Sequence, residues 1–220
     1  MNKRNYQKEL EKTLVRIKEG AEGDGARPSL FLHSCCAPCS SYVLEYLSQY
    51  FSITVFYYNP NISPEEEYEE RVSEQERLIR ELNEEWSGDQ SRTPVRFLSG
   101  PYEPERFYQA VKGLEKEPEG GLRCTECFSL RLEEAARMAA EGGYDFFTTT
   151  LSISPLKDAE RLNRIGEEMG AKYGIAYLNS DFKKKNGYRR SIELSALHHL
   201  YRQDYCGCVY SKRQRESKVL

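Results

Sequence analysis

Short apolar runs alternate along the chain with longer segments in which apolar residues recur at helical spacing. The short runs predict five strands: SLFLHS (29–34), SITVFYY (52–58), PVRFLSG (near 94–99), YDFFTTTLSISP (144–155) and GIAYLNS (174–180). The helical spacing predicts helices near 40–50, 64–86, 104–114, 124–141, 158–169 and 188–201. Because strands alternate with helices of ten or more residues, the pattern predicts an α/β fold, a parallel sheet with helices on both faces.

The first 27 residues differ from this pattern. They predict an amphipathic helix with Leu10, Leu14 and Ile17 on one side, followed by the glycine-rich linker GAEGDGARP. We therefore expect an N-terminal helical extension and linker over residues 1–27. Residues 28–220 would then form one α/β catalytic domain with a basic C-terminal segment.

Composition narrows the class of protein. The chain has 220 residues, of which 39% are hydrophobic and 30% are charged. Its start is charged and lacks the apolar stretch of a secretory signal, and no apolar run approaches the length of a membrane helix. These features predict a cytoplasmic protein with no membrane partner. Thiols stay reduced in that compartment, which favours metal or redox roles over structural disulfides.

Charge is unevenly distributed. Residues 183–220 contain ten basic and three acidic residues, a net charge of +7, so the remainder carries −10 of the total of −3. Tyrosines are interleaved with the basic residues at Tyr188, Tyr201, Tyr205 and Tyr210. This segment is typical of a surface that binds phosphates and stacks on bases. A solvated basic helix with a frayed tail explains the same composition.

The seven cysteines fall into three motifs: Cys35-Cys36-x-x-Cys39, Cys124-x-x-Cys127 and Cys206-Gly207-Cys208. The first follows the first predicted strand, at the sheet edge where α/β proteins bind ligands. That edge would also gather residues 59–61, 99–102, 150–158 and 179–181. The turn after the first strand has neither GxGxxG nor GxxxxGK[ST], which argues against a nucleotide site there.

The spacing of the motifs indicates metal and thiol redox chemistry. Cys124 and Cys127 would lie on one side of a helical turn and face one metal centre. Four thiolates is the ligand count of a [4Fe–4S] cluster, but a structural zinc site or unligated buried cysteines also fit. Cys206 and Cys208 fit a redox couple better than a structural bond, although both could bind a metal. The third thiol of the first motif, Cys39, is left to bind a second, open-site metal or to relay electrons.

Other candidate residues have competing interpretations. His33 could donate a hydrogen bond to a cluster sulfur or be satisfied in the core. Asp158 is most simply a helix N-cap, with a proton-donor role as the alternative, and Asp181 has a similar position at the active edge. We expect Tyr102 and Tyr108 to pack in the core rather than stack on a base. His198, His199 and Trp86 are expected to be structural.

Five strings carry a family resemblance: LHSCCAPCS (32–40), YNPNISPEEEYEER (58–71), RCTECFSLRLEEAA (123–136), FTTTLSISPLKD (147–158) and YRQDYCGCVYS (201–211). Together they resemble the QueH type of epoxyqueuosine reductase over roughly residues 28–211. The resemblance implies a two-electron reduction of epoxyqueuosine to queuosine at the wobble position of a tRNA. It also implies a [4Fe–4S] cluster, an external electron donor and a fold similar to the HUP nucleotide α-hydrolase domains. The 27-residue leading segment is a departure from the family core.

By motif, the resemblance gives Cys35, Cys36, Cys124 and Cys127 as cluster ligands and Cys206 and Cys208 as the redox pair. It also implies an additional mononuclear iron, which Cys39 is positioned to help bind. An open metal site would polarise the epoxide carbon–oxygen bond as a Lewis acid. Two other functions remain to be compared with this one: a cluster-dependent tRNA sulfur-transfer enzyme on the same kind of fold, and a zinc-stabilised RNA-binding module.

Overall fold

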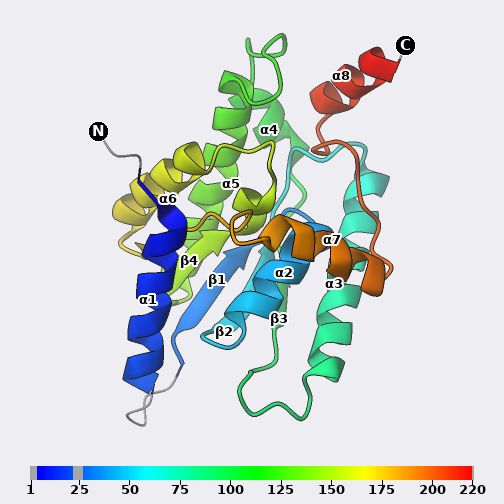
Figure 1. Ribbon diagram of the computed structural model, residues 1–220. Helices are drawn as coiled ribbons and strands as arrows, with labels where there is room; N and C mark the ends of the chain where they lie inside the picture. Colours follow the sequence, from blue (N-terminus) through cyan, green and yellow to red (C-terminus); the bar gives the residue numbers. More distant parts are fainter. Residues whose placement is uncertain (1–3, 22–26, 220) are drawn as a thin grey trace.

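The computed structural model describes residues 4–21 and 27–219. Within these residues the strands form a five-stranded sheet in which every pairing is parallel, in the order β3-β2-β1-β4-β5 (Figure 1). The strands are β1 (Ser29–His33), β2 (Ser52–Tyr57), β3 (Arg96–Ser99), β4 (Phe146–Thr149) and β5 (Ala176–Tyr177). The predicted α/β class is confirmed, and the architecture is consistent with the HUP-like fold.

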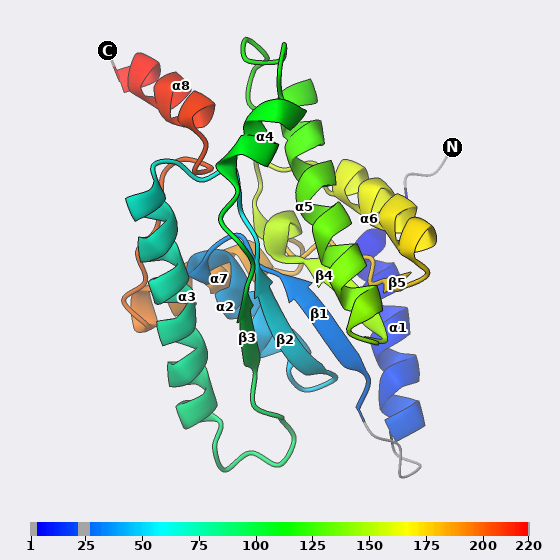
Figure 2. The same ribbon diagram turned by 180° about the vertical axis from the view of Figure 1, so that it is seen from behind.

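Helices cover both faces of the sheet (Figures 1 and 2). They are α1 (Tyr6–Ala21), α2 (Ala37–Leu47), α3 (Glu65–Glu85), α4 (Pro104–Ala110), α5 (Leu122–Glu141), the 3₁₀ helix η1 (Thr150–Ile153), α6 (Ala159–Tyr173), α7 (Gly187–Leu197) and α8 (Val209–Val219). Helices α1, α2 and α3 share one apolar cluster with one sheet face, and α5 packs on the other. Helix α7 lies against α2, and α6 lies against α5.

Because side chains alternate along β1, successive residues pack against helices on opposite faces of the sheet. Leu30 and Leu32 belong to the cluster of α1, α2 and α3, whereas Phe31 belongs to the cluster of α5. Successive side chains of a strand point to opposite faces, and here both faces are buried. His33, two residues after Phe31, is fully buried and lies within hydrogen-bonding range of an α5 arginine.

The N-terminal helix packs into the core. Leu10 and Leu14 of α1 are almost completely buried and join the cluster that contains α2 and β1. Burying a leucine side chain contributes about 1.5–3 kcal/mol, so these two contacts hold α1 on the sheet. The division of the chain at residue 27 stays a prediction, and residues 22–26 of the predicted linker lie outside the described residues.

The strand order reverses between β1 and β4. The chain builds β1, β2 and β3 outward on one side, then crosses to β4 and β5 on the other. At such a switch point the loops after the two central strands separate and leave room for a ligand. The Cys35-Cys36 turn follows β1 and η1 follows β4, and the Cys35 amide donates to Thr150 Oγ1 across the gap (3.2 Å).

Three predicted elements differ from the structure. The predicted strand 144–155 ends at Thr149, because the Thr149 hydroxyl accepts from the Leu151 amide and caps η1. The last strand shortens to Ala176–Tyr177 at the sheet edge. Helix α8 is not among the predicted helices, and it forms where one of the two interpretations of the basic segment has a frayed tail. No helix of the described chain is long and apolar enough to cross a membrane.

Candidate active site

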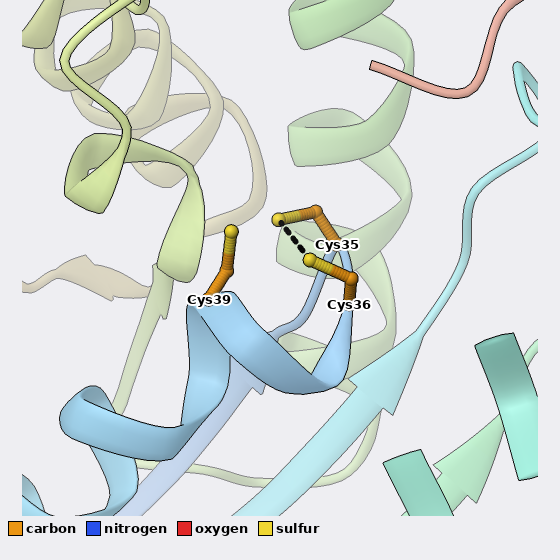
Figure 3. A group of neighbouring side chains, drawn as sticks. All are labelled: Cys35, Cys36 and Cys39. Carbon is orange, nitrogen blue, oxygen red and sulfur yellow. Dashed lines mark hydrogen bonds between the residues drawn. The ribbon is translucent and has the colours of Figure 1, made fainter. Parts of the chain in front are cut away.

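Three cysteine sulfurs converge where β1 meets α2. The Sγ atoms of Cys35, Cys36 and Cys39 all lie within 4.8 Å of one another, and those of Cys35 and Cys36 are 3.9 Å apart. Cys36 is the extended N-cap residue of α2, and Cys39 lies in the first turn of that helix. The backbone therefore turns all three side chains toward one point, as Figure 3 shows. We call these residues the three-sulfur group.

The thiols of the three-sulfur group share protons. Cys36 and Cys39 hydrogen-bond to the Cys35 sulfur, and this lowers the pKa of Cys35 well below its usual range. The same hydrogen bond, together with burial, raises the pKa of Cys36 to about 12 and also raises that of Cys39. These hydrogen bonds therefore favour the thiolate form at Cys35 over that at Cys36 or Cys39. A bound cation would stabilise further thiolates, because metal ligation deprotonates thiols.

The other four cysteines line one cavity of about 230 Å³. Cys124 and Cys127 reach it from the first two turns of α5, and Cys206 and Cys208 reach it from the turn before α8. The Gly120 amide donates to the Cys124 sulfur (3.2 Å). The Cys124 and Cys127 pair and the Cys206-Gly207-Cys208 turn therefore line the same cavity.

The three-sulfur group and the cavity are neighbours. Cys124 packs against the apolar cluster that holds Cys35, Cys36 and Phe128. Lys157 lines the cavity, where burial opposes its charge but the thiolates of Cys206, Cys35 and Cys39 raise its pKa overall. The charge of Lys157 therefore interacts with sulfurs of the three-sulfur group and with a sulfur of the cavity. The fold brings the three cysteine motifs together.

The glycine between Cys206 and Cys208 makes close contacts that hold their turn in place. Gly207 has φ +106°, and its carbonyl accepts from the Ser63 amide (3.0 Å). A Cβ built on it would lie 2.9 Å from Ile62 Cγ1 and 3.0 Å from Arg71 Nη1. Only glycine combines this backbone angle with so close an approach.

Gly207→Ala is expected to lower the free energy of unfolding by about 1–3 kcal/mol and to displace the two flanking thiols. Chemical denaturation measures the first effect, and the alkylation rates of Cys206 and Cys208 measure the second. Gly113→Ala is the matched control: Gly113 has φ +84° and no neighbour within 4 Å of its Cβ position. Equal losses in the two variants, with unchanged alkylation rates, would show that the contacts of Gly207 do not matter.

His33 is held by the core and not by sulfur. Its Nδ1 lies 2.9 Å from Thr149 Oγ1 and its Nε2 lies 3.1 Å from the Tyr58 carbonyl oxygen. Both ring nitrogens are therefore engaged. Burial, with the nearby Arg131 charge, lowers the pKa of His33 to about 3, so the ring is neutral. Of the two interpretations of His33, the core-satisfied one is confirmed.

The contacts of the other candidate residues show which structural role each one has. Asp158 is the N-cap of α6, accepting from the amides of Glu160 (2.9 Å) and Arg161 (3.3 Å), and it also lines the cavity. Asp181 is paired with Lys183 (2.6 Å). Tyr102 stacks on a core tyrosine and donates to the Ile62 carbonyl, so its structural interpretation is confirmed.

Three further candidates, Tyr108, His198 and Trp86, each contact another side chain. Tyr108 is 39% exposed beside Phe107, so the prediction that it packs in the core is wrong. His198 lies 3.1 Å from Glu81. Trp86 lies under the Arg92 guanidinium.

Three cations near the thiols were not found by sequence reasoning. Arg131, Arg71 and Lys157 all carry charges that interact with the cysteines. Arg131 was detectable in principle, because it lies four residues after Cys127 and therefore on the same side of a helix. The other two come from separate elements, so no local pattern connects them with the cysteines.

Comparison with known proteins gives a consistent result. The chain matches the family model described as epoxyqueuosine reductase QueH over residues 30–214. It is 44% identical over 210 residues to the epoxyqueuosine reductase QueH of Staphylococcus epidermidis, covering 94% of this chain and 86% of that one. For the Streptococcus pyogenes protein of the same name, identity is 41%, covering 96% and 81%. For that of Thermotoga maritima it is 34%, covering 86% and 93%.

These alignments also concern the leading segment. Coverage of 96% leaves 4% of 220 residues, about nine, outside the alignment with the Streptococcus pyogenes protein. Most of the first 27 residues therefore have a counterpart in that relative. The family model begins at residue 30, so the leading segment lies outside it, as expected for a segment that the family core does not need, and the Streptococcus pyogenes protein is one relative that also carries it.

Proposed function

The chain belongs to the epoxyqueuosine reductase QueH family and is an oxidoreductase, and from this premise we propose that it converts epoxyqueuosine to queuosine at the wobble position of a tRNA. The observation that carries the proposal is the cavity lined by Cys124, Cys127, Cys206 and Cys208 beside the three-sulfur group. A reductase of this kind needs electron carriers next to a space for its substrate, and this arrangement supplies both. Family membership favours it over sulfur transfer and over a non-catalytic zinc module.

The residues fit a [4Fe–4S] cluster, with Cys35, Cys36, Cys124 and Cys127 as the proposed ligands. Thiolates are the ligands such clusters require, and these four are buried or half-buried. Two buried donors beside β2 and α2, Tyr57 Oη and Gln75 Nε2, have no hydrogen-bond partner in the described part of the chain. When bound, the cluster would supply electrons one at a time.

The proposed role of Cys39 is to help hold an additional mononuclear iron. Its sulfur belongs to the three-sulfur group, so a metal held by Cys39 would lie beside the cluster ligands Cys35 and Cys36. Such a metal would be close enough to act with the cluster. It would serve as a Lewis acid toward the substrate oxygen.

Cys206 and Cys208 are proposed to provide the electron pair. Reduction of the epoxide breaks its two carbon–oxygen bonds, forms a carbon–carbon double bond and releases the oxygen as water. The dithiol supplies two electrons and two protons as its two S–H bonds are replaced by one S–S bond. An external donor then reduces the disulfide. Lys157, which lines the cavity together with Arg123 and Arg161, would stabilise negative charge that develops on the leaving oxygen.

Anaerobic purification tests the proposal. We expect brown protein containing iron and sulfide, where a zinc module would be colourless. With a chemical reductant it should convert epoxyqueuosine in tRNA to queuosine, measured by mass spectrometry of the digested nucleosides. Iron-loaded protein that leaves this substrate unchanged would overturn the proposed reaction.

The basic C-terminal residues are proposed to bind the tRNA, and the structure places six of the ten on helices α7 and α8. On α7, Arg190 is paired with Glu45 (2.6 Å) and Arg189 with Glu193 (3.3 Å). On α8, Lys212 and Arg213 are exposed and have no ion pair with a described carboxylate. Cys208 and Ser211, at the start of α8, line the cavity, which favours α8 as the nearer phosphate contact.

Reversing basic charges on or near α7 and on α8 tests which of the two helices contributes more to tRNA binding. Lys212→Glu with Arg213→Glu is expected to weaken tRNA binding at least about tenfold and to reduce the slope of log affinity against log salt by about 2. Reversing Lys184, Arg189 and Arg190 together should also weaken binding, but less, because two of these charges are already paired. Filter binding over a salt series measures both effects, and iron content should not change.

The matched control is Lys12→Glu with Arg16→Glu. Both residues are exposed on α1, and the change in net charge equals that of the α8 variant. Helix α1 lies away from α8 in both views (Figures 1 and 2). An equal loss of affinity in the α1 control would mean that net charge, and not the α8 surface, determines binding.

A further inference from the structure

Arg131 is a buried cation with no ion pair to any acidic residue of the described chain. Its side chain is 1% exposed, and it points from the middle of α5 toward the ends of β1 and β2. The Nη2 group donates to Asn59 Oδ1, Nε lies 3.4 Å from His33 Nε2, and Nη1 lies 3.9 Å from Cys127 Sγ. The amide and the neutral imidazole cannot balance a full positive charge.

The first two acidic residues after Arg131 on its own helix are paired with other cations, and Glu133 pairs with Lys172. Glu134 pairs with Arg137 (2.6 Å) and Arg106 (3.5 Å). Two other buried arginines near the thiols have oxygen partners: Arg71 is paired with Glu67 (2.6 Å), and Arg123 donates to the backbone carbonyls of Glu115 and Glu117. Arg131 therefore differs from Arg71 in having no carboxylate within ion-pair distance among the residues described.

A buried charge without a counter-charge costs several kcal/mol, so an unpaired arginine is expected to have a negative neighbour in the working protein. The remaining candidates are sulfurs. Burial opposes the charge of Arg131, but the thiolates of Cys127, Cys35 and Cys206 raise its pKa overall. These three sulfurs come from the three separate cysteine motifs, and the direct contact is the one between Nη1 and Cys127 Sγ (3.9 Å).

We propose that Arg131 is a positioning residue: a fixed positive charge that balances the anionic metal–thiolate centre and makes that centre easier to reduce. This inference rests on the proposed function, because it requires the thiolates to hold a metal centre. A four-thiolate cluster is an anion, and its reduction adds a further negative charge. A guanidinium held close by, without a carboxylate, stabilises the reduced form more than the oxidised form.

Arg131→Gln removes the charge and keeps an amide donor near Asn59, whereas Arg131→Lys keeps the charge and loses the planar fork. In the anaerobically reconstituted enzyme, Arg131→Gln is expected to shift the equilibrium constant for reduction at least tenfold toward the oxidised form, about 59 mV for a one-electron couple. Arg131→Lys should shift it less than half as far on the millivolt scale. A redox titration followed by electron paramagnetic resonance measures both.

A second readout separates this role from a structural one. We expect the rise in Tm on metal loading to be smaller in Arg131→Gln than in the wild type, because the charge stabilises only the loaded form. A purely structural arginine would lower the Tm of both forms equally. Arg92→Gln, which changes an arginine that contacts Trp86 and Ser48 instead of the thiols, should change neither the potential nor the rise in Tm.

The following results would overturn either the proposed role of Arg131 or the proposed function. An Arg131→Gln enzyme with wild-type iron content, potential and metal-dependent Tm would overturn the proposal. Equal iron loss in the Gln and Lys variants would also overturn it, since charge would then not be the cause. If Arg131→Gln does not fold, Arg131→Met tests the same prediction with the side-chain volume kept. A wild-type protein that binds no iron would instead remove the proposed function.

Discussion

Cys35→Ser is expected to reduce bound iron to a small fraction of the wild-type content and turnover by at least about 100-fold. Serine oxygen is a poor replacement for a soft thiolate ligand of iron. Cys35 also has the lowest pKa of the three-sulfur group, because Cys36 and Cys39 hydrogen-bond to it. Loss of its sulfur therefore removes the thiolate that forms most readily. Iron and sulfide analysis, with the visible spectrum of the anaerobic protein, measures the first effect.

Two comparisons make this prediction specific. Ser41→Ala removes a buried hydroxyl from α2, the helix that follows Cys35, and within the described residues this hydroxyl bonds to the Pro38 carbonyl alone, so iron content should stay unchanged. Cys39→Ser should keep the spectrum of the cluster and lose only the additional iron. A Cys35→Ser protein with full iron content would exclude Cys35 as a ligand. A Cys39→Ser protein that loses the cluster would move Cys39 into the ligand set.

The sheet and its active edge were predictable because their signals are local. Each strand is a short apolar run, and β1 and β2 are buried on both faces, as a central parallel strand requires. The turn after β1 contains Cys35 and Cys36, so the position of the first motif followed from the topology alone. The convergence of all three motifs did not follow from spacing, since it depends on how α5 and the turn before α8 pack.

The errors have physical reasons. The segment of α8 has few apolar residues, so amphipathic spacing could not indicate a helix. The TTT run at 148–150 favours a strand by composition, but the Thr149 hydroxyl caps the next turn and ends it. Arg131 was missed because its distinguishing feature is the absence of a carboxylate within ion-pair distance among the described residues. No sequence pattern reveals that a buried arginine has no carboxylate partner.

Replacing either Cys206 or Cys208 by serine is expected to lower turnover by at least about 100-fold while leaving iron content intact. A serine cannot form the S–S bond that releases the electron pair, so the dithiol step is lost and not merely slowed. Reduced wild-type protein, freed of excess reductant, should convert about one substrate per active site and lose two hydrogens in mass from the peptide that contains both cysteines. The variants should convert none under the same conditions.

Ser211→Ala is the appropriate control for this pair. The Ser211 amide and hydroxyl both lie 3.4 Å from the Cys208 sulfur, and burial together with the Cys206 charge raises the pKa of Cys208. Removal of the hydroxyl should therefore change the rate of reoxidation modestly and keep turnover. If Cys206→Ser and Cys208→Ser both retained full turnover with an external reductant, electrons would reach the substrate from the metal centre alone. The Cys206-Gly207-Cys208 turn would then serve only to close the cavity against Asn61 and Ile62.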